Sequence, residues 1–206
     1  MEIDKIDNVI QNLKEMILNR DENIDEFEEH EVEIEREEFY NDNKIITFYT
    51  EKTVLIFALT KNLRIQIIDN LKKNKNNLEA FVKDYNGKYN IILIFNNDLL
   101  TTPSINQLSI IDKLLQKKDG MLQYFHINEL LLNPTKHELV PKHRKLSNDE
   151  IKEVMDKYLI KSKLQMPLIL HTDRIAKWIG LKQGDIIEIT RYNENSGKIF
   201  YYRCCV

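Results

Sequence analysis

A short segment between Pro134 and Pro141 most constrains how this chain can fold, because it separates two regions with different residue patterns. Each proline removes a backbone donor and moves the preceding residue out of the helical region. The segment between them is therefore expected to be extended, with the apolar pair Leu139 and Val140 as its anchor. We interpret it as a hinge between two domains.

The region before the hinge begins with a helix and an acidic run. Apolar residues recur every three to four positions through residues 2–19, which predicts a helix with one buried stripe. The acidic run over residues 21–38 includes Phe27 and is followed by Phe39, but it has few other apolar residues. We interpret it as a solvated helix or loop, which is a commoner role for such a run than a partner-binding motif.

Between residues 44 and 133, short apolar runs rich in β-branched residues alternate with helical patterns. The expected strands are 45–49, 54–59, 91–95 and 122–127, and the expected helices are 63–71 and 103–115. Continuous apolar strands separated by helices are typical of a sheet covered on both faces. Residues 1–134 are therefore expected to form an α/β domain.

Residues 135–206 predict a smaller α+β domain. Ser147 followed by Glu150 matches the capping box that begins a helix, expected over 148–159. The later elements are a strand at 168–170, a short helix from Asp173 to Trp178, and strands 185–191 and 198–205, which form a hairpin through Ser196 and Gly197.

Charge is distributed unevenly along the chain. The first 40 residues hold 15 acidic and 4 basic side chains, which leaves 18 acidic and 26 basic ones in the remainder, a net charge of +8 there. This excess is compatible with a nucleic-acid neighbour, but an ordinary solvated surface explains it equally well. No apolar run approaches the ~20 residues of a membrane span, and the acidic start does not resemble a signal peptide. We therefore expect an intracellular protein without a membrane partner.

The sequence has no motif typical of a catalytic or cofactor site. With 5 glycines in all it lacks a phosphate loop, and the adjacent Cys204 and Cys205 do not have the spacing of a zinc site, so we interpret both as reduced and structural. A metal-dependent nuclease needs a set of carboxylates near a strand. The one candidate, Glu150 with Lys152, lies in the first turn of a helix, where Glu150 already has a capping role. We expect no catalytic residue, no bound metal and no cofactor.

A series of motifs resembles a known family. In the second half these are Thr135-x-His137-Glu138-Leu139-Val140-Pro141-Lys142-His143, Leu146-Ser147-x-x-Glu150, Gln165-x-Pro167, Asp173-x-x-Ala176, Gly180-Leu181-Lys182-x-Gly184, Ile187-x-Ile189-x-Arg191, Ser196-Gly197 and Tyr202-Arg203-x-x-Val206. They are similar to the fifth-largest subunit shared by eukaryotic RNA polymerases I, II and III, whose C-terminal half resembles an archaeal RNA polymerase subunit. The first half matches the eukaryotic subunit more weakly, at Lys14-Glu15-Met16, Asn19-Arg20, Glu31-Val32-Glu33, Phe95-x-Asn97 and Thr102-Pro103-Ser104. It departs from the family at Asp21-Glu22, where Gly-Tyr is usual, and at Ile105, where Ala is usual.

The resemblance implies a non-catalytic subunit of a multisubunit DNA-directed RNA polymerase, acting in transcription. Residues 1–134 would be a nuclease-like jaw domain near downstream DNA, and residues 135–206 an assembly domain on the largest subunit. The location would be the nucleus for a cellular protein, or the host cytoplasm or virion for a protein of a large DNA virus, which the divergence favours. A metal-dependent nuclease built on the α/β half and a free-standing nucleic-acid-binding adaptor remain alternatives.

The resemblance also implies which residues meet the partners. The expected subunit-interface residues are His137, Leu139, Val140, Pro141, Lys142, His143, Arg191, Tyr202 and Arg203. We expect the two histidines to hydrogen-bond backbone groups at the domain junction or a partner subunit rather than to bind a metal, because no third ligand accompanies them. Lys142, Arg144 and Lys145 form a small basic cluster that could face solvent or an acidic partner surface. Arg203 is expected to pair with a carboxylate or carbonyl beside Tyr202.

The expected DNA-proximal residues are Thr102, Pro103 and Ser104. Thr102 is predicted as the N-cap of a helix with Pro103 in its first turn. Exposed amides at a helix start can hold a phosphate. Such a turn steadies a DNA backbone but cannot read a base sequence, so the contact with downstream duplex DNA should be weak and non-specific.

Overall fold

The computed structural model describes residues 2–32, 34–41, 44–74, 78–98, 100–195 and 197–206. Its backbone divides into two compact units, Met1–Leu132 and Asn133–Val206, and each contains one four-stranded sheet. The predicted two-part α/β organisation is thereby confirmed in outline. The predicted boundary lies two residues further along the chain than this division, and its role as a limit of independent folding stays a prediction.

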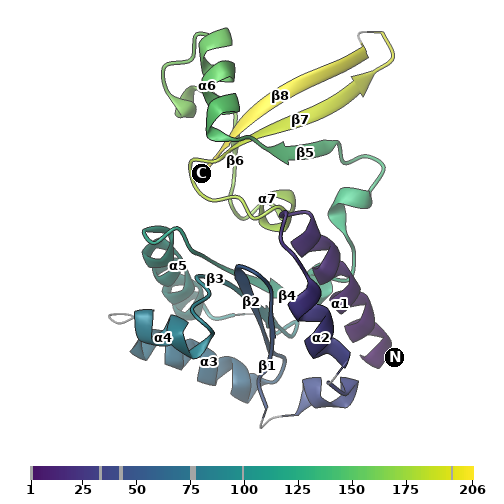
Figure 1. Cartoon of the computed structure of the whole chain (residues 1–206), viewed down its shortest axis with the longest axis vertical. Coiled ribbons are helices and arrows are strands. Elements are labelled where there is room, and N and C mark those ends of the chain that lie inside the picture. Colours follow the sequence, from purple (N-terminus) through teal and green to yellow (C-terminus); the bar gives the residue numbers. More distant parts are fainter. Residues whose placement is uncertain (1, 33, 42–43, 75–77, 99, 196) are drawn as a thin grey trace. The chain divides into compact units, whose positions relative to one another are not determined.

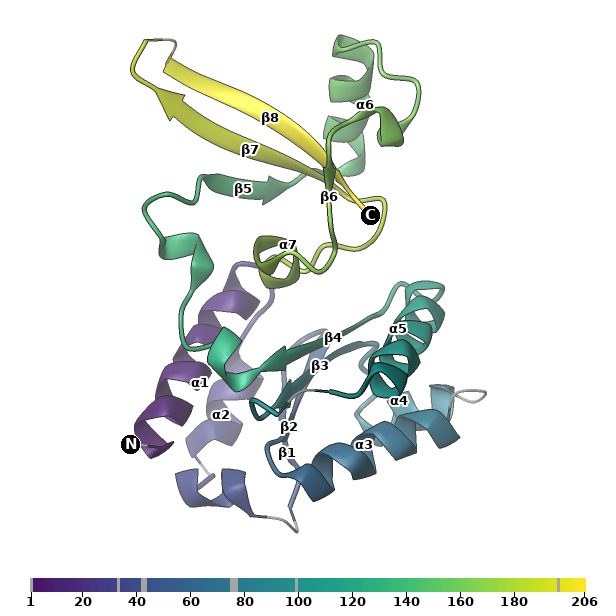
Figure 2. The same ribbon diagram turned by 180° about the vertical axis from the view of Figure 1, so that it is seen from behind.

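The first unit is a mixed sheet between two layers of helices (Figures 1 and 2). Its elements are α1 (Glu2–Leu18), α2 (Asp25–Val32), η1 (Arg36–Tyr40), β1 (Ile46–Tyr49), β2 (Thr53–Ala58), α3 (Lys61–Lys73), α4 (Leu78–Asp84), β3 (Asn90–Phe95), α5 (Thr102–Gln116), β4 (Met121–His126) and η2 (Ile127–Glu129). The strand order is β1-β2-β3-β4, in which β1 is antiparallel to β2 and the other pairs are parallel.

Side chains alternate between the two faces of this sheet. Val54, Ile91 and Leu122, which are in register across β2, β3 and β4, share a core with α3, α4 and α5. The opposite face carries Phe48 and Phe57 toward α1, α2 and η1. Every residue of β2 is buried, as expected of a strand covered on both faces.

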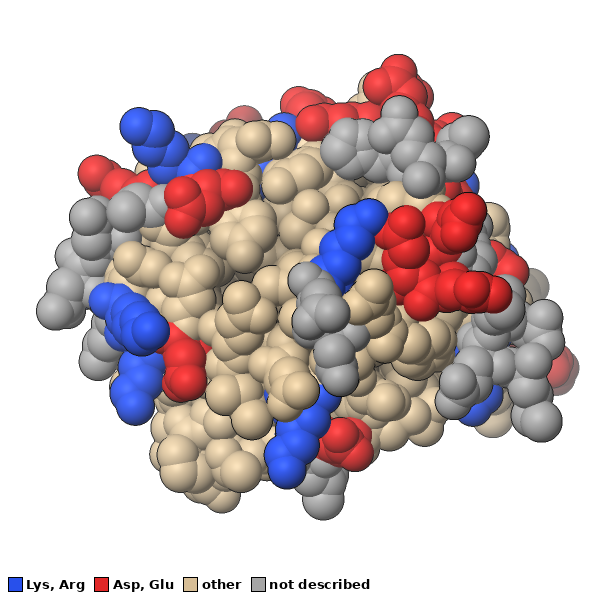
Figure 3. All heavy atoms as spheres, turned by 90° about the horizontal axis from the view of Figure 1, so that it is seen from below, with Lys and Arg blue, Asp and Glu red and all other residues tan. Residues whose placement is uncertain are grey.

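The acidic segment after α1 is not merely solvated, and this part of the prediction was wrong. Phe27 on α2 is fully buried and stacks on Phe48, with ring centroids 4.5 Å apart. Phe39 on η1 is 2% exposed and lies edge-on to Phe57 at 5.0 Å. Two aromatic anchors therefore hold this segment on the sheet, while its carboxylates face outward. Acidic side chains accordingly gather on the α1–α2 side of the face in Figure 3.

The second unit is a smaller sheet with one helix on each face (Figure 1). Its elements are η3 (Pro134–Lys136), β5 (Lys142–Lys145), α6 (Asn148–Lys157), η4 (Lys163–Gln165), β6 (Leu168–Ile169), α7 (Arg174–Trp178), β7 (Ile186–Asn193) and β8 (Gly197–Cys205). The strand order is β5-β7-β8-β6, with the long β7–β8 hairpin at its centre. Gly197, at φ +70°, completes the predicted turn, whereas Ser196 lies outside the described residues.

Each face of the second sheet has its own apolar cluster. Ile186 and Cys204 pack with Ile151 and Val154 of α6. Ile187 and Cys205, on the opposite face, pack with Ala176 of α7. Both cysteines are free and buried, as predicted, and burial raises the pKa of the Cys205 thiol to about 11. The unit therefore contains a complete core of its own.

Candidate functional site

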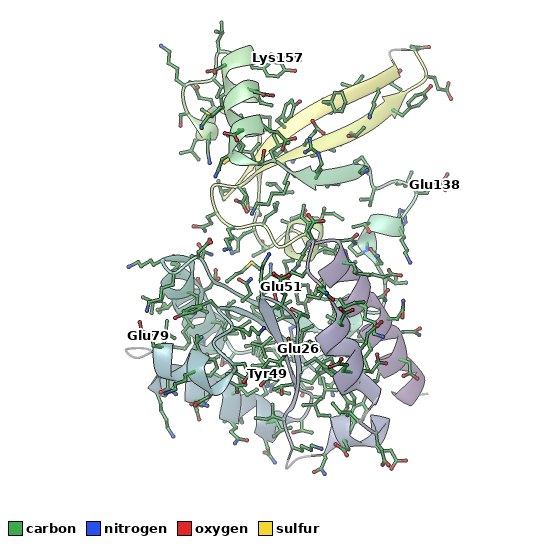
Figure 4. All side chains as sticks on the ribbon, viewed as in Figure 1. Glu26, Tyr49, Glu51, Glu79, Glu138 and Lys157 are labelled. Carbon is green, nitrogen blue, oxygen red and sulfur yellow. The ribbon has the colours of Figure 1, made fainter. Side chains whose placement is uncertain are left out.

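The segment between the two prolines is a compact turn, not the extended segment that was predicted. Pro134 lies in η3, where the Asn133 side chain accepts a hydrogen bond from the Thr135 amide at 2.9 Å. The Val140 amide then donates to the His137 carbonyl at 2.9 Å. Local hydrogen bonds thus replace the extended conformation that prolines favour. Figure 4 shows Glu138 at the outer side of this turn.

Leu139 was predicted as the anchor of the segment, but its side chain is 84% exposed. Its amide donates to Nδ1 of His137 at 3.2 Å, so the turn is held by its own polar groups. The other anchor residue, Val140, is partly buried. The turn therefore presents a leucine to solvent in an ordered conformation.

His143 follows on β5, where its Nδ1 lies 2.6 Å from the Pro141 carbonyl oxygen. Burial lowers the pKa of His143, while the hydrogen bond to Pro141 opposes that effect. Asp173 raises the pKa, and Arg191 and Arg203 lower it. Both histidines of the motif are thus engaged with backbone groups, as expected.

The predicted interface residues divide between the two faces of the sheet. His143 is in register with Ile189, and Ile189 with Tyr201, which places them on the α7 face near Arg191. The Arg191 guanidinium lies over the Tyr201 ring at 5.3 Å. Tyr201 is an exposed aromatic that the motif-based interpretation missed.

Arg203 and Tyr202 point to opposite faces of β8. Arg203 Nη1 donates to the Leu168 carbonyl at 3.2 Å, which ties β8 to β6 and matches the predicted pairing with a carbonyl. Tyr202 lies on the α6 face, with its ring 5.8 Å from that of Tyr158 and its hydroxyl 3.4 Å from Glu188. Burial and the nearby Glu188 raise the Tyr202 pKa. The two neighbours therefore belong to different surfaces.

The basic cluster on β5 is largely neutralised within the unit. Arg144 donates to Glu150 at 2.6 Å and to Glu188 at 3.2 Å, and Lys145 pairs with Asp185 at 2.7 Å. Only Lys142 of the three remains an exposed cation for which the structure gives no such pairing among the described residues. The cluster is thus mainly a brace between β5, β7 and α6.

Glu150 has the capping role that was predicted. Its Oε2 accepts from the Ser147 amide at 2.8 Å, and Ser147 Oγ accepts from the Glu150 amide at 3.4 Å. The hydrogen bond from the Ser147 amide, followed by that from Arg144, lowers the pKa of Glu150 to about 2. Both oxygens of this carboxylate are thus engaged by donors of the chain. Within the part of the chain that the structure describes, no group of three or more His, Cys, Asp or Glu residues could hold a metal ion.

Helix α5 begins one residue earlier than predicted. Thr101 is the N-cap and Thr102 the first helical residue, with Pro103 next and Ser104 completing the first turn. The Thr101 and Ser104 hydroxyls lie 2.9 Å apart, and the Thr101 side chain accepts no capping hydrogen bond. Thr102 and Pro103 are exposed and Ser104 is partly buried. The first-turn amides of Thr102 and Ser104 therefore lack a side-chain acceptor from the cap.

The departure from the family pattern after α1 forms a buried polar cluster. Asp21 has φ +58° at the position where Gly is usual, and the Glu22 amide donates to the Ile17 carbonyl at 3.3 Å. Glu22 is 7% exposed, and its carboxylate accepts from the Thr50 and Thr53 hydroxyls at 2.8 Å each. This carboxylate thus ties the end of α1 to the β1–β2 turn.

Arg20 lies beside this cluster. Its guanidinium donates to Gln123 Oε1 on β4 at 2.7 Å. Burial lowers the pKa of Arg20 to about 10, although the neighbouring Glu22 opposes the shift. Arg20 remains charged at neutral pH and links α1 to the far edge strand.

Known proteins match most of this chain. The family model described as RNA polymerase Rpb5, C-terminal domain, matches residues 132–205. Over 180 residues the chain is 30% identical to DNA-directed RNA polymerases I, II, and III subunit rpabc1 of Dictyostelium discoideum, a match that spans 86% of each chain. The chain belongs to the Rpb5 family.

A further Rpb5 relative, DNA-directed RNA polymerases I, II, and III subunit RPABC1 of Caenorhabditis briggsae, is 37% identical over 86 residues, which is 42% of this chain and 40% of the relative. As an Rpb5 family member, the chain is a non-catalytic subunit of a multisubunit DNA-directed RNA polymerase and acts in transcription. The resemblance predicted from the motifs is confirmed. Family membership supports this role over the nuclease and the free-standing adaptor. No described helix is long and apolar enough to cross a membrane.

Proposed function

We propose that the second unit docks this subunit on the largest subunit of its polymerase, through the 137–143 turn and the α7 face of the sheet. The observation that carries this proposal is the exposure of Leu139, a large apolar side chain that is 84% exposed in a turn ordered by its own hydrogen bonds. An exposed apolar side chain in an ordered conformation loses little entropy when a partner covers it. Burying a leucine contributes about 1.5–3 kcal/mol.

The docking proposal is tested with Leu139→Asp in the full chain. The variant should retain the melting temperature of the wild type, because the side chain contacts little within the unit. It should co-purify with the other polymerase subunits at a much lower yield. Leu18→Asp, at a leucine that is 52% exposed on α1, is the matched control and should assemble normally. Equal yields for the two variants would remove Leu139 from the interface.

Arg203 tests the other half of the docking surface. Its hydrogen bond to the Leu168 carbonyl is exposed, so its loss should cost the isolated chain only about 1 kcal/mol. If the α7 face meets the largest subunit, Arg203→Ala weakens assembly more than it lowers the melting temperature. The reverse order would make Arg203 a structural brace between β6 and β8.

We further propose that the first unit is the jaw domain and that the start of α5 lies beside downstream duplex DNA. The supporting observation is the first turn of α5, where Thr102 and Pro103 are exposed and the cap leaves the helix amides without a side-chain acceptor. The positive end of the helix dipole favours a phosphate there. One or two neutral contacts release few counterions, so the free protein binds duplex DNA weakly and without sequence preference.

The DNA contact is tested with the double change Thr102→Glu and Ser104→Glu. Two carboxylates placed against phosphates should shorten the lifetime of salt-challenged elongation complexes and leave subunit assembly intact. Ser109→Glu, a substitution at an exposed position of the same helix, is the control for added charge away from the first turn. Equal lifetimes for all three proteins would leave this site as a plain helix start.

The compartment in which the subunit acts depends on whether its polymerase is cellular or viral. The subunit acts in the nucleus if the polymerase is cellular, and in the host cytoplasm or virion if it is viral. The departure at Asp21-Glu22 from the usual family pattern favours the viral source. Immunogold labelling of the producing cells distinguishes the two, because signal confined to the nucleus excludes the viral alternative.

A further inference from the structure

One edge of strand β8 is open over its outer part. The amides of Cys204 and Val206 donate to Pro167 and Ile169 on the β6 side, whereas the Cys205 amide donates to Asp185 on the β7 side. Because backbone groups alternate along a strand, the amides and carbonyls of residues 198, 200 and 202 point away from β7. Strand β6 is parallel to β8 and begins at Leu168, opposite Cys204, so it does not reach residues 198, 200 and 202.

The open edge differs from the corresponding edge of the first sheet. There, on β4, the Leu122 amide donates to the Asp112 carboxylate at 2.8 Å, and the His126 amide donates to Glu129 at 3.0 Å. Side-chain acceptors thus engage two outward amides of that edge strand, those of Leu122 and His126. Proteins protect edge strands in such ways because an unprotected edge pairs readily with another chain. Among the described residues, no side-chain acceptor of this kind meets the amides of Phe200 or Tyr202 on β8.

The chain segment beside this edge is strained and apolar. Leu159, which follows the C-cap residue Tyr158 of α6, has φ +54° and is 87% exposed. The left-handed conformation favours glycine and costs other residues about 1–2 kcal/mol. A leucine here gains almost no burial within the chain in return. Its neighbour Tyr158 is 51% exposed, and its ring centroid lies 5.8 Å from that of Tyr202, so this loop lies on the α6 face of the sheet next to β8.

The charges around the open edge are mostly basic. Lys198 lies on β8 itself, and Lys157 and Lys161 flank the exposed Tyr158–Leu159 pair. Figure 4 shows Lys157 at the C-terminal end of α6. The nearby acids are Asp156, next to the pair in the chain, and Glu188, which Tyr202 and Arg144 contact. An extended segment that alternates apolar and acidic side chains would complement both the exposed aromatic residues and this charge.

From these observations we infer that the β8 edge, residues 198–202, binds an extended segment of another polymerase subunit as a fifth strand, with Leu159 covering one of its apolar side chains. The added strand would continue the line of β6 and pair with the outward groups of β8. This inference rests on the proposed docking of the second unit and specifies a contact separate from the Leu139 turn.

Hydrogen exchange provides the direct test. In the free full chain, the Phe200 and Tyr202 amides should exchange fast, while those of Tyr201 and Arg203, which face β7, are protected. In the assembled polymerase, Phe200 and Tyr202 should become at least about tenfold slower. Exchange measured by mass spectrometry with residue-resolving fragmentation separates these neighbours. Unchanged exchange at Phe200 and Tyr202 in a polymerase that contains the chain would overturn the inference.

Leu159→Gly is the decisive variant. Glycine relieves the left-handed strain, so the free chain should melt at the same or a higher temperature than the wild type. Loss of the apolar side chain should weaken assembly about ten- to a hundredfold. A lower melting temperature with unchanged assembly would assign Leu159 a structural role and contradict the proposal.

The outcomes distinguish this inference from the docking proposal. If the chain does not assemble with a polymerase at all, the docking proposal fails. If it assembles and only the β8 edge stays unprotected, the inference alone fails. If the Phe200 and Tyr202 amides are already protected in a free chain that elutes as a dimer, a second copy occupies the edge and the inference is again wrong.

Discussion

Phe27 stacks on Phe48 with ring centroids 4.5 Å apart and an interplanar angle of 17°. This contact fixes α2, an acidic helix, on the sheet through one fully buried side chain. Phe27→Ala should destabilise the chain by about 3–5 kcal/mol, because it removes an aromatic ring and leaves a cavity. Urea unfolding followed by fluorescence measures the change. Glu29→Ala on the exposed face of the same helix is the control and should shift stability by less than about 0.5 kcal/mol.

The same contact shows what local patterns could and could not predict. The regular apolar spacing predicted α1 to within one residue at its end, because one side of a helix must be buried. It could not predict the burial of Phe27 and Phe39, since each is a lone aromatic among carboxylates and only the distant β1 and β2 provide its partners. The acidic composition therefore correctly predicted that the carboxylates of this segment face solvent. It did not predict that the two aromatic side chains are buried against the sheet.

Two elements had no local signal. The sequence of β5 is a cluster of basic residues with no strand pattern. It forms a strand because β7, far along the chain, pairs with it. Helix α4 follows a Lys/Asn-rich patch that lies partly outside the described residues, and its apolar side chains complete a core formed by other elements. In the site, the motifs singled out the 137–143 turn, but the exposure of Leu139 depends on how the chain folds between two prolines.

Asp21 offers a test of backbone strain. It has φ +58° three residues after the end of α1, where its amide donates to the Leu18 carbonyl and the Glu22 amide donates to the Ile17 carbonyl. Asp21→Gly should raise the stability of the chain by about 1 kcal/mol, since glycine adopts this conformation without steric cost. A thermal melt of both proteins measures the gain. Asp21→Ala should give no gain, and equal stabilisation by both substitutions would show that removal of the carboxylate, not backbone strain, is responsible.

His143 should make stability depend on pH. Its folded pKa lies below the ordinary value of 6.5, because burial and the nearby Arg191 and Arg203 disfavour the charged form. The unfolded chain therefore binds more protons than the folded chain as the pH falls through this range, so stability should decrease on acidification below about pH 7. In His143→Gln this contribution to the pH dependence of the unfolding free energy should disappear. Urea midpoints between about pH 5 and about 8 provide the comparison, and parallel curves would contradict the role given to His143.

The second unit should fold without the first. It contains its own sheet and apolar clusters on both faces, and Asn133 caps its first turn. A fragment of residues 133–206 should unfold cooperatively and give well-dispersed amide NMR signals. The same fragment carrying Ile187→Asp, a fully buried position, serves as the unfolded reference. A wild-type fragment with the narrow dispersion of that reference would mean that the unit depends on residues 1–132.

The central claim is that this Rpb5 family member is built into a polymerase through its second unit. Affinity purification of the tagged full chain from the organism that encodes it, with identification of the co-eluting chains, tests this most directly. The account predicts that the largest polymerase subunit elutes with the wild-type chain in equal amount and is lost with Leu139→Asp, while Leu18→Asp retains it. A wild-type chain that elutes without polymerase subunits would contradict the account.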